Sequence, residues 1–191
     1  MITLYKNKTC CFTGHRPMRL PFGFEEEHPL CIALKKLLKR EIQKKIEQGC
    51  IDFITGAAWG VDIICAEIVL ELKKQYPEIN LICVIPHEEQ ATKWNEEYRT
   101  RYFGIIDQSD DMILISYQYT PTCFHERNRY MVDNAMHVIA VYNGNEKGGT
   151  SYTIEYARKK GRNVTVINSN DLTVEQSDNP RTKFTVISRD R

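Results

Sequence analysis

Short apolar segments that alternate with longer amphipathic ones constrain the fold of this chain more than any other feature of its sequence. The apolar segments have the length and β-branched content of buried strands. They occupy residues 9–12, 51–55, 81–85, 112–116, 137–142 and 163–167. Between them, apolar residues recur at helical spacing, as from Leu30 to Ile46. Almost wholly apolar strands separated by helices predict an α/β fold, a Rossmann-like doubly wound and mostly parallel sheet with helices on both faces.

The length of 191 residues fits one domain. We expect the Rossmann-like domain to span residues 1–168, because the alternation ends there. Residues 169–191 are polar and form a C-terminal extension, whose strand-like piece at 184–188 is either an added edge strand or part of a partly disordered tail. The segment 88–106 is rich in aromatic residues and predicts a helix that lies across the others.

The composition excludes several classes of protein. The chain has 26 basic and 25 acidic side chains, a net charge of +1, which gives little support to binding of nucleic acid or of a membrane surface. Its apolar runs are far shorter than the roughly 18–20 residues of a membrane span, and its first residues do not form a signal peptide, so we expect a cytoplasmic protein. Its 7 cysteines include no Cys-x-x-Cys pair. We therefore expect neither a metal site nor a redox pair, and no required cofactor.

The polar residues of interest follow the predicted strands. In a doubly wound sheet, ligands bind beyond the carboxyl ends of the strands, at the point where the strand order reverses. The loops expected at that edge are residues 13–17, 56–62, 86–89, 117–127 and 144–150. Together they predict a binding site on one edge of the sheet.

The last of these loops has the pattern of a phosphate-binding turn. Gly148, Gly149 and Thr150 lie between the predicted strand 137–142 and a helical pattern that stops near Gly161. Glycines let backbone N–H groups approach an anion, and the first turn of a helix has unpaired donors and a positive dipole end. Thr150 or Ser151 would cap this helix and reach a phosphate oxygen. The alternative is a plain glycine turn before a capped helix.

Three of the loops together resemble a known family. They are Thr13-Gly14-His15-Arg16-Pro17, the segment Gly-Ala-Ala-Trp-Gly-Val-Asp at residues 56–62, and the glycine loop. They resemble the YpsA-like family of the SLOG superfamily, which also contains the LONELY GUY phosphoribohydrolases and the DNA-processing protein DprA. The resemblance covers roughly residues 9–167 and implies a Rossmann-like fold that binds a nucleotide or a nucleotide-derived ligand.

The resemblance to the phosphoribohydrolases extends to single residues. His125-Glu126-Arg127-Asn128 is similar to their His-Glu-Arg-Lys string, which places Arg127 where their catalytic arginine lies and replaces the lysine by asparagine. Their phosphate loop continues to a glutamate, whereas here Glu155 comes two residues late. Two residues rotate a helix by about 200°, so Glu155 would face away from the site. The resemblance implies Arg127 and, less directly, Glu155 as catalytic residues.

The same comparison gives a set of expected ligand-binding residues. Arg16 and Arg127 would bind phosphate or diphosphate through paired hydrogen bonds. His15 either donates to the ligand or bonds the loop backbone, and Asp62 either caps its helix or accepts a hydrogen bond from ribose or base. The full set is Thr13, Gly14, His15, Arg16, Gly56, Ala57, Gly60, Asp62, Arg127, Gly148, Gly149 and Thr150.

Three functions remain open at this point. The first is a sensing or regulatory module that binds a nucleotide-derived ligand such as ADP-ribose or an NAD-like molecule. The second is hydrolysis of the N-glycosidic bond of a nucleotide, for which Glu89, Glu126 and Glu155 are the candidate carboxylates. The third is DprA-like binding of single-stranded DNA, through a local patch of basic residues at 127–129 and 158–162. By analogy with the phosphoribohydrolases, we also expect a homodimer.

Overall fold

The computed structural model describes residues 2–145 and 147–177. Its centre is a sheet of strands in the order β4-β3-β2-β1-β5-β6-β7, in which neighbours from β4 to β6 are parallel and β7 is antiparallel to β6. The strands are β1 (Thr9–Gly14), β2 (Asp52–Thr55), β3 (Asn80–His87), β4 (Asp111–Ser116), β5 (His137–Tyr142), β6 (Asn163–Asn168) and β7 (Val174–Ser177). The predicted doubly wound, mostly parallel α/β fold is confirmed.

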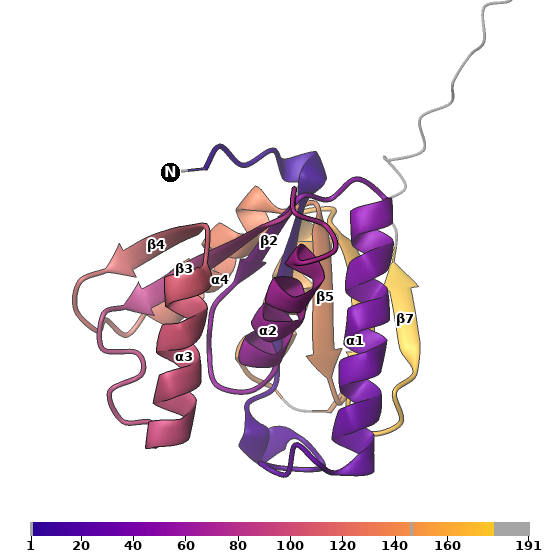
Figure 1. The fold of residues 1–191 in the computed structure, drawn as a ribbon, viewed down its shortest axis with the longest axis horizontal. Coiled ribbons are helices and arrows are strands. Elements are labelled where there is room, and N and C mark those ends of the chain that lie inside the picture. Colours follow the sequence, from indigo (N-terminus) through magenta and orange to yellow (C-terminus); the bar gives the residue numbers. More distant parts are fainter. Residues whose placement is uncertain (1, 146, 178–191) are drawn as a thin grey trace, which may run out of the picture.

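Helices cover both faces of this sheet (Figure 1). One face carries α1 (Pro29–Glu47), α2 (Val61–Lys73) and α3 (Glu96–Gln108), and the other carries α4 (Cys123–Asn134) and α5 (Gly149–Lys159). The helix predicted within 88–106 begins only at Glu96, because the side chain of Asn95 accepts a hydrogen bond from the backbone N–H of Tyr98 and so caps α3 there.

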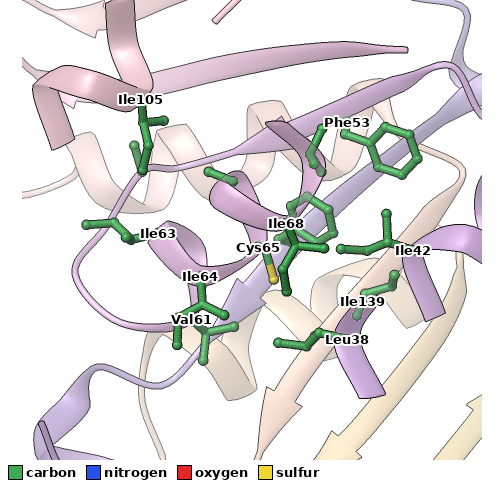
Figure 2. Packing of buried hydrophobic residues seen from close by; sticks show 14 of the residues in the cluster. Leu38, Ile42, Phe53, Val61, Ile63, Ile64, Cys65, Ile68, Ile105 and Ile139 are labelled. Atoms are coloured by element: carbon green, nitrogen blue, oxygen red, sulfur yellow. The ribbon is translucent and has the colours of Figure 1, made fainter. Parts of the chain in front are cut away.

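The larger core cluster lies between the sheet and helices α1, α2 and α3. Figure 2 shows Ile42 of α1 and Ile68 of α2 packing toward Phe53 of β2 and Ile139 of β5. These apolar side chains are buried because the strands are apolar on both faces, as the pattern predicted. The cysteines are free and buried, and burial raises the pKa of the Cys11 thiol to about 12. They pack as small hydrophobic side chains.

Within the described residues, β6 is followed by the strand β7. β7 adds to the edge of the sheet through backbone pairing such as Thr165 with Gln176. The strand-like piece expected at 184–188 lies outside the described residues, and the division of the chain at residue 168 stays a prediction. Among the described residues, no helix combines the length and the apolar character that crossing a membrane requires.

The order of the strands reverses beside β1. β1 pairs with β2 on one side and with β5 on the other, so the connections leaving β1 and β5 diverge to opposite faces of the sheet. In Figure 1 β5 ends at the lower edge, close to the turn that precedes α1. β1 extends to Gly14, two residues beyond its predicted end, because Thr13 and Gly14 continue the pairing with β5. This extension carries the polar end of β1 to the switch point.

Candidate functional site

A cavity of about 300 Å³ lies at this switch point. Its walls come from the end of β1 and the turn that follows it, the loop between β2 and α2, the first turns of α4, and the start of α5. It is lined by Phe12, Thr13, Gly14, Arg16, Arg19, Ala58, Asp62, Phe124, Arg127, Asn128, Gly148, Gly149 and Thr150. Most of the expected ligand-binding residues are therefore brought together, whereas His15, Gly56, Ala57 and Gly60 lie behind the lining.

The deepest polar feature of the cavity is a buried ion pair. Nη1 of Arg127 lies 3.3 Å from Oδ2 of Asp62, and each of these residues is only 6% exposed. The same carboxylate oxygen accepts a weak hydrogen bond of 3.4 Å from the backbone N–H of Ala58. Burial raises the pKa of the Asp62 carboxyl group and lowers the pKa of the Arg127 guanidinium, and each charge opposes the effect on the other. The pair fixes Arg127 at the back of the cavity.

Gly56 makes room for this pair. A β-carbon on Gly56 would lie 1.1 Å from Nη1 of Arg127 and 2.8 Å from Oδ2 of Asp62, so the guanidinium rests directly on the glycine backbone. The side-chain amide of Gln90 donates to the carbonyl oxygens of Gly56 and Ala57, both at 3.2 Å. Ala57 has a φ of 45°, a backbone conformation that is energetically unfavourable for a residue with a side chain. Gly56 and Ala57 thus support Arg127 rather than line the cavity.

His15 and Gly60 join the loops on either side of the cavity. His15 is 2% exposed, and its Nε2 accepts a hydrogen bond of 3.2 Å from the backbone N–H of Asn143, just after β5. Its carbonyl oxygen accepts from the N–H of Val61 at 3.3 Å and lies 2.6 Å from the position of a β-carbon on Gly60. Gly60 also has a φ of 105°, which favours glycine. Of the two roles open for His15, the structure places it against the loop backbone.

The start of α5 forms another wall. Oγ of Ser151 accepts from the N–H of Gly148 at 2.9 Å and donates to the Gly148 carbonyl at 3.0 Å, so Ser151 shapes the turn and Thr150 faces the cavity. The N–H groups of the first helical turn have no partner within the helix and lie at its positive dipole end. This wall therefore suits an anion.

Two exposed arginines complete the rim. Arg19 is the last residue of the short 3₁₀ helix η2 (Pro17–Arg19), and Arg16 is the residue just before this helix. The Arg16 guanidinium carbon is 5.8 Å from the centroid of the Phe124 ring, and Nη1 of Arg19 donates to the carbonyl of Lys147 at a long 3.5 Å. Arg19 was missed in the sequence. It lies two residues beyond the loop 13–17 that was expected at the site, so no signal in the sequence singled it out.

The carboxylate that accompanies Arg127 is not one of the three candidates from the sequence. Glu89, Glu126 and Glu155 are exposed and lie outside the cavity lining. Glu155 lies on α5, and its catalytic role stays a prediction. Among the described residues that line the cavity, Asp62 alone has a carboxylate.

Fold and site together define a Rossmann-like α/β domain with an arginine-lined cavity at its switch point. The family model YpsA, described as "YspA SLOG family", matches residues 10–172, and the chain belongs to this family. UPF0398 proteins from Bacillus thuringiensis strain Al Hakam and Bacillus cereus strain AH187 are each 31% identical to it over 156 residues, which cover 81% of this chain and 84% of theirs. The predicted family membership is confirmed.

The fold is also similar to that of a solved structure. The solved structure of DNA processing protein A from Helicobacter pylori, which describes that protein's single-stranded DNA binding mode, superposes with a TM-score of 0.59 at 17% identity. The match covers 92% of this chain and 71% of that one. At this identity the similarity concerns the fold.

Proposed function

We propose that this protein binds a nucleotide or a nucleotide-derived ligand, such as ADP-ribose or an NAD-like molecule, in the cavity at the switch point. The protein would act as a sensing or regulatory module. The observation that carries this proposal is the gathering of Arg16, Arg19 and Arg127 around one cavity that also opens on the start of α5. The proposed binding requires neither a metal nor a further cofactor.

The charges of the cavity favour a phosphate-bearing ligand. Arginines outnumber carboxylates among the lining residues, and the one carboxylate, Asp62, is already paired with Arg127. Every phosphate group of a nucleotide is negatively charged at pH 7 and offers strong acceptor oxygens, and a terminal phosphate carries about −1.5 to −2 charge. Guanidinium groups bind such oxygens through paired hydrogen bonds, and backbone N–H groups at a helix start add to them. Membership in the SLOG family supports the same class of ligand.

Hydrolysis of an N-glycosidic bond is the second candidate function. The observation that favours it is the Asp62 carboxylate, which lines the cavity beside Arg127. A carboxylate there could orient an attacking water while arginine offsets the charge of the phosphate. Binding remains the preferred function because both Arg127 and the N–H of Ala58 already donate to Asp62 Oδ2, which leaves less of the carboxylate for a water.

Binding of single-stranded DNA is the third function to be tested. The patch of basic residues at 127–129 and 158–162 includes Arg129. Its guanidinium carbon lies 5.8 and 5.9 Å from the ring centroids of Tyr152 and Tyr156. Lys160 covers Tyr156 as well, and its ammonium lies 3.5 Å from Asp133. These aromatic rings already have cationic partners within the chain, which leaves them less available to stack on DNA bases. The patch therefore supports DNA binding less than the cavity supports binding of a small ligand.

A thermal-shift panel tests the proposal. Wild type and Arg16→Ala are measured with AMP, ADP, ADP-ribose, NAD and a short single-stranded DNA, with Arg99→Ala as the control, since Arg99 is an exposed arginine on α3 away from the cavity. A ligand at about 100 times its dissociation constant stabilises a fold by about 2.7 kcal/mol. We expect a nucleotide to stabilise wild type and the control but not Arg16→Ala.

The panel also separates the three functions. Stabilisation by DNA alone, with a strong dependence on salt, would favour the DNA function. Release of free base from a stabilising nucleotide, abolished in Asp62→Asn, would favour hydrolysis. No response to any nucleotide would contradict the proposal. The expected homodimer is checked on the same samples by light scattering.

A further inference from the structure

The sheet formed by the described residues ends in two edge strands of different character. At one edge, β7 carries Glu175, Gln176 and Ser177, whose side chains are polar and exposed. At the other edge, β4 reads Asp-Met-Ile-Leu-Ile-Ser, and its residues 112–116 are uncharged. Natural proteins protect edge strands with charged side chains, among other devices, because the backbone groups there can pair with another chain. β7 has a polar edge of this kind, and β4 has an apolar one.

The outer edge of β4 has no strand beside it among the described residues. In Figure 1, β4 forms the left margin of the sheet. Ile113, Leu114 and Ile115 are only partly buried, whereas the apolar residues of the inner strands β1 and β2 are fully buried. Met112 is 51% exposed. This edge therefore combines apolar side chains with outward-facing backbone groups that have no strand partner.

An exposed phenylalanine of α3 adds to the apolar surface on this side of the molecule. Nε and Nη2 of Arg101 donate to the carboxylate of Glu67, so this side of α3 faces α2. Phe103 comes two residues later, a rotation of about 200° around the helix, and therefore points away from α2. It is 60% exposed. Leu114 packs in the same core cluster as the buried residues of α3, so Met112, two residues earlier on the strand, lies on the face of the sheet that α3 covers.

The sequence of β4 is compatible with pairing to a second copy of itself. Residues directly opposite each other in an antiparallel pair project on the same face of the sheet. A two-fold axis through Leu114 places Ile113 of each copy opposite Ile115 of the other, which is an apolar pair. The two copies of Asp111 then lie about 20 Å apart, six residues at about 3.4 Å each, which is about twice the screening length at 0.1 M salt. The pairing therefore brings no like charges together.

We propose that β4 pairs antiparallel with β4 of a second copy of this chain around a two-fold axis, so that the two sheets join at their apolar edges. A two-fold contact uses the same surface of both copies and closes at the dimer, which leaves neither β4 edge free. The second copy is the occupant because it presents an uncharged, apolar strand to an uncharged, apolar strand. This proposal goes beyond the nucleotide-binding function and does not depend on it.

Analytical ultracentrifugation over a series of protein concentrations tests the proposal on wild type, Met112→Lys and the control Met18→Lys. Met18 is 62% exposed and lies on η2, which follows the central strand β1. We expect wild type to dimerise. Met112→Lys should raise the dissociation constant of the dimer at least about 10-fold, because lysine on an edge strand opposes pairing and each substitution acts twice in a symmetric dimer. Met18→Lys should dimerise like wild type.

Hydrogen exchange locates the contact. At equal protein concentration, the outward-facing backbone amides of β4 should exchange more slowly in wild type than in Met112→Lys, and those of β7 should not differ. A wild type that is monomeric at every concentration would overturn the proposal. Slow exchange of the β4 amides in such a monomer would mean that a segment of the same chain covers the edge.

Two further outcomes would also overturn the proposal. A dimer that Met112→Lys does not weaken would have its interface elsewhere, and so would a dimer that Met18→Lys weakens equally. Thermal unfolding of each variant establishes that it is folded. A monomeric wild type that is stabilised by a nucleotide would leave the proposed binding function in place, so the two failures are distinguishable.

Discussion

Nη1 of Arg127 lies 1.1 Å from the position that a β-carbon would occupy on Gly56, so the buried arginine fits in its position only because residue 56 is a glycine. Arg127 comes from α4 and Gly56 from the loop after β2, two segments far apart in the chain. Their contact carries the guanidinium across the carboxyl edge of the sheet to Asp62. The site therefore depends on a residue that does not line the cavity.

Gly56→Ala should displace Arg127 and separate it from Asp62. Insertion of a methyl group into a packed interior costs about 1–3 kcal/mol, and the loss of the ion pair adds to this. We expect a lower free energy of unfolding in urea together with loss of nucleotide-dependent stabilisation. The matched control is Gly104→Ala on α3, where a β-carbon meets nothing within 4 Å, so alanine should stabilise the protein by about 0.5–1 kcal/mol. Equal stability of Gly56→Ala and wild type would contradict the fit of Arg127 on the glycine.

Asp62→Asn should change how stability depends on pH. Burial raises the pKa of the Asp62 carboxyl group above its ordinary value of 3.8, more than Arg127 lowers it. Between 3.8 and the raised pKa, the folded state binds more protons than the unfolded state, so this group makes the fold less stable as the pH rises. Asparagine does not titrate. Wild type should therefore lose stability relative to Asp62→Asn as the pH rises above about 4, in urea titrations from pH 4 to pH 7. If wild type instead gains stability relative to Asp62→Asn over this range, the charge of Arg127 has a larger effect on the pKa of Asp62 than burial has.

The sequence predicted the parallel part of the fold because its strands are short and mostly apolar, whereas the apolar residues of the helices recur every three to four positions. The strand His137–Tyr142 matched its predicted bounds for this reason. The site was predicted less completely. The rule for switch points selected the correct loops, yet the pairing of Arg127 with Asp62 joins residues 65 positions apart, and no local pattern reports such a contact. Arg19 was missed for the same reason, because its place on Gly148 exists only once the loops after β1 and β5 meet.

His15→Phe should weaken the connection between those two loops. Phenylalanine fills the buried space but offers no acceptor to the N–H of Asn143, and loss of a partner for such a group costs about 1–3 kcal/mol when it is buried. We expect a loss near the lower end of this range, about 1 kcal/mol, because the bond is partly buried. Urea unfolding measures it. His15→Gln keeps an acceptor and should recover part of the loss, whereas an equal loss in both variants would show that the hydrogen bond to Asn143 does not account for the loss.

Glu26→Gln should reduce stability at neutral pH through an ion-pair network away from the cavity. Nε and Nη2 of Arg101 donate to Glu67 at 2.7 and 2.8 Å, and Nη1 donates to Glu26 at 2.5 Å, so one guanidinium on α3 joins α2 to the segment before α1. Burial alone would raise the pKa of Glu26, but the hydrogen bonds and charges of Arg101 and Lys35 lower it below its ordinary value of 4.5. The contribution of Glu26 is therefore present above that value and is lost as the pH falls through the lowered pKa.

For this variant we expect a loss of about 1 kcal/mol at pH 7, since solvent screens a partly exposed pair. Urea titrations from pH 7 to pH 3 measure the difference from wild type, which should shrink as Glu26 becomes protonated in both folded and unfolded chains. Glu27→Gln is the matched control, because Glu27 is the exposed neighbour of Glu26. A difference between Glu26→Gln and wild type that does not change with pH would show that the glutamine disturbs packing and that the charge of Glu26 contributes nothing to the network.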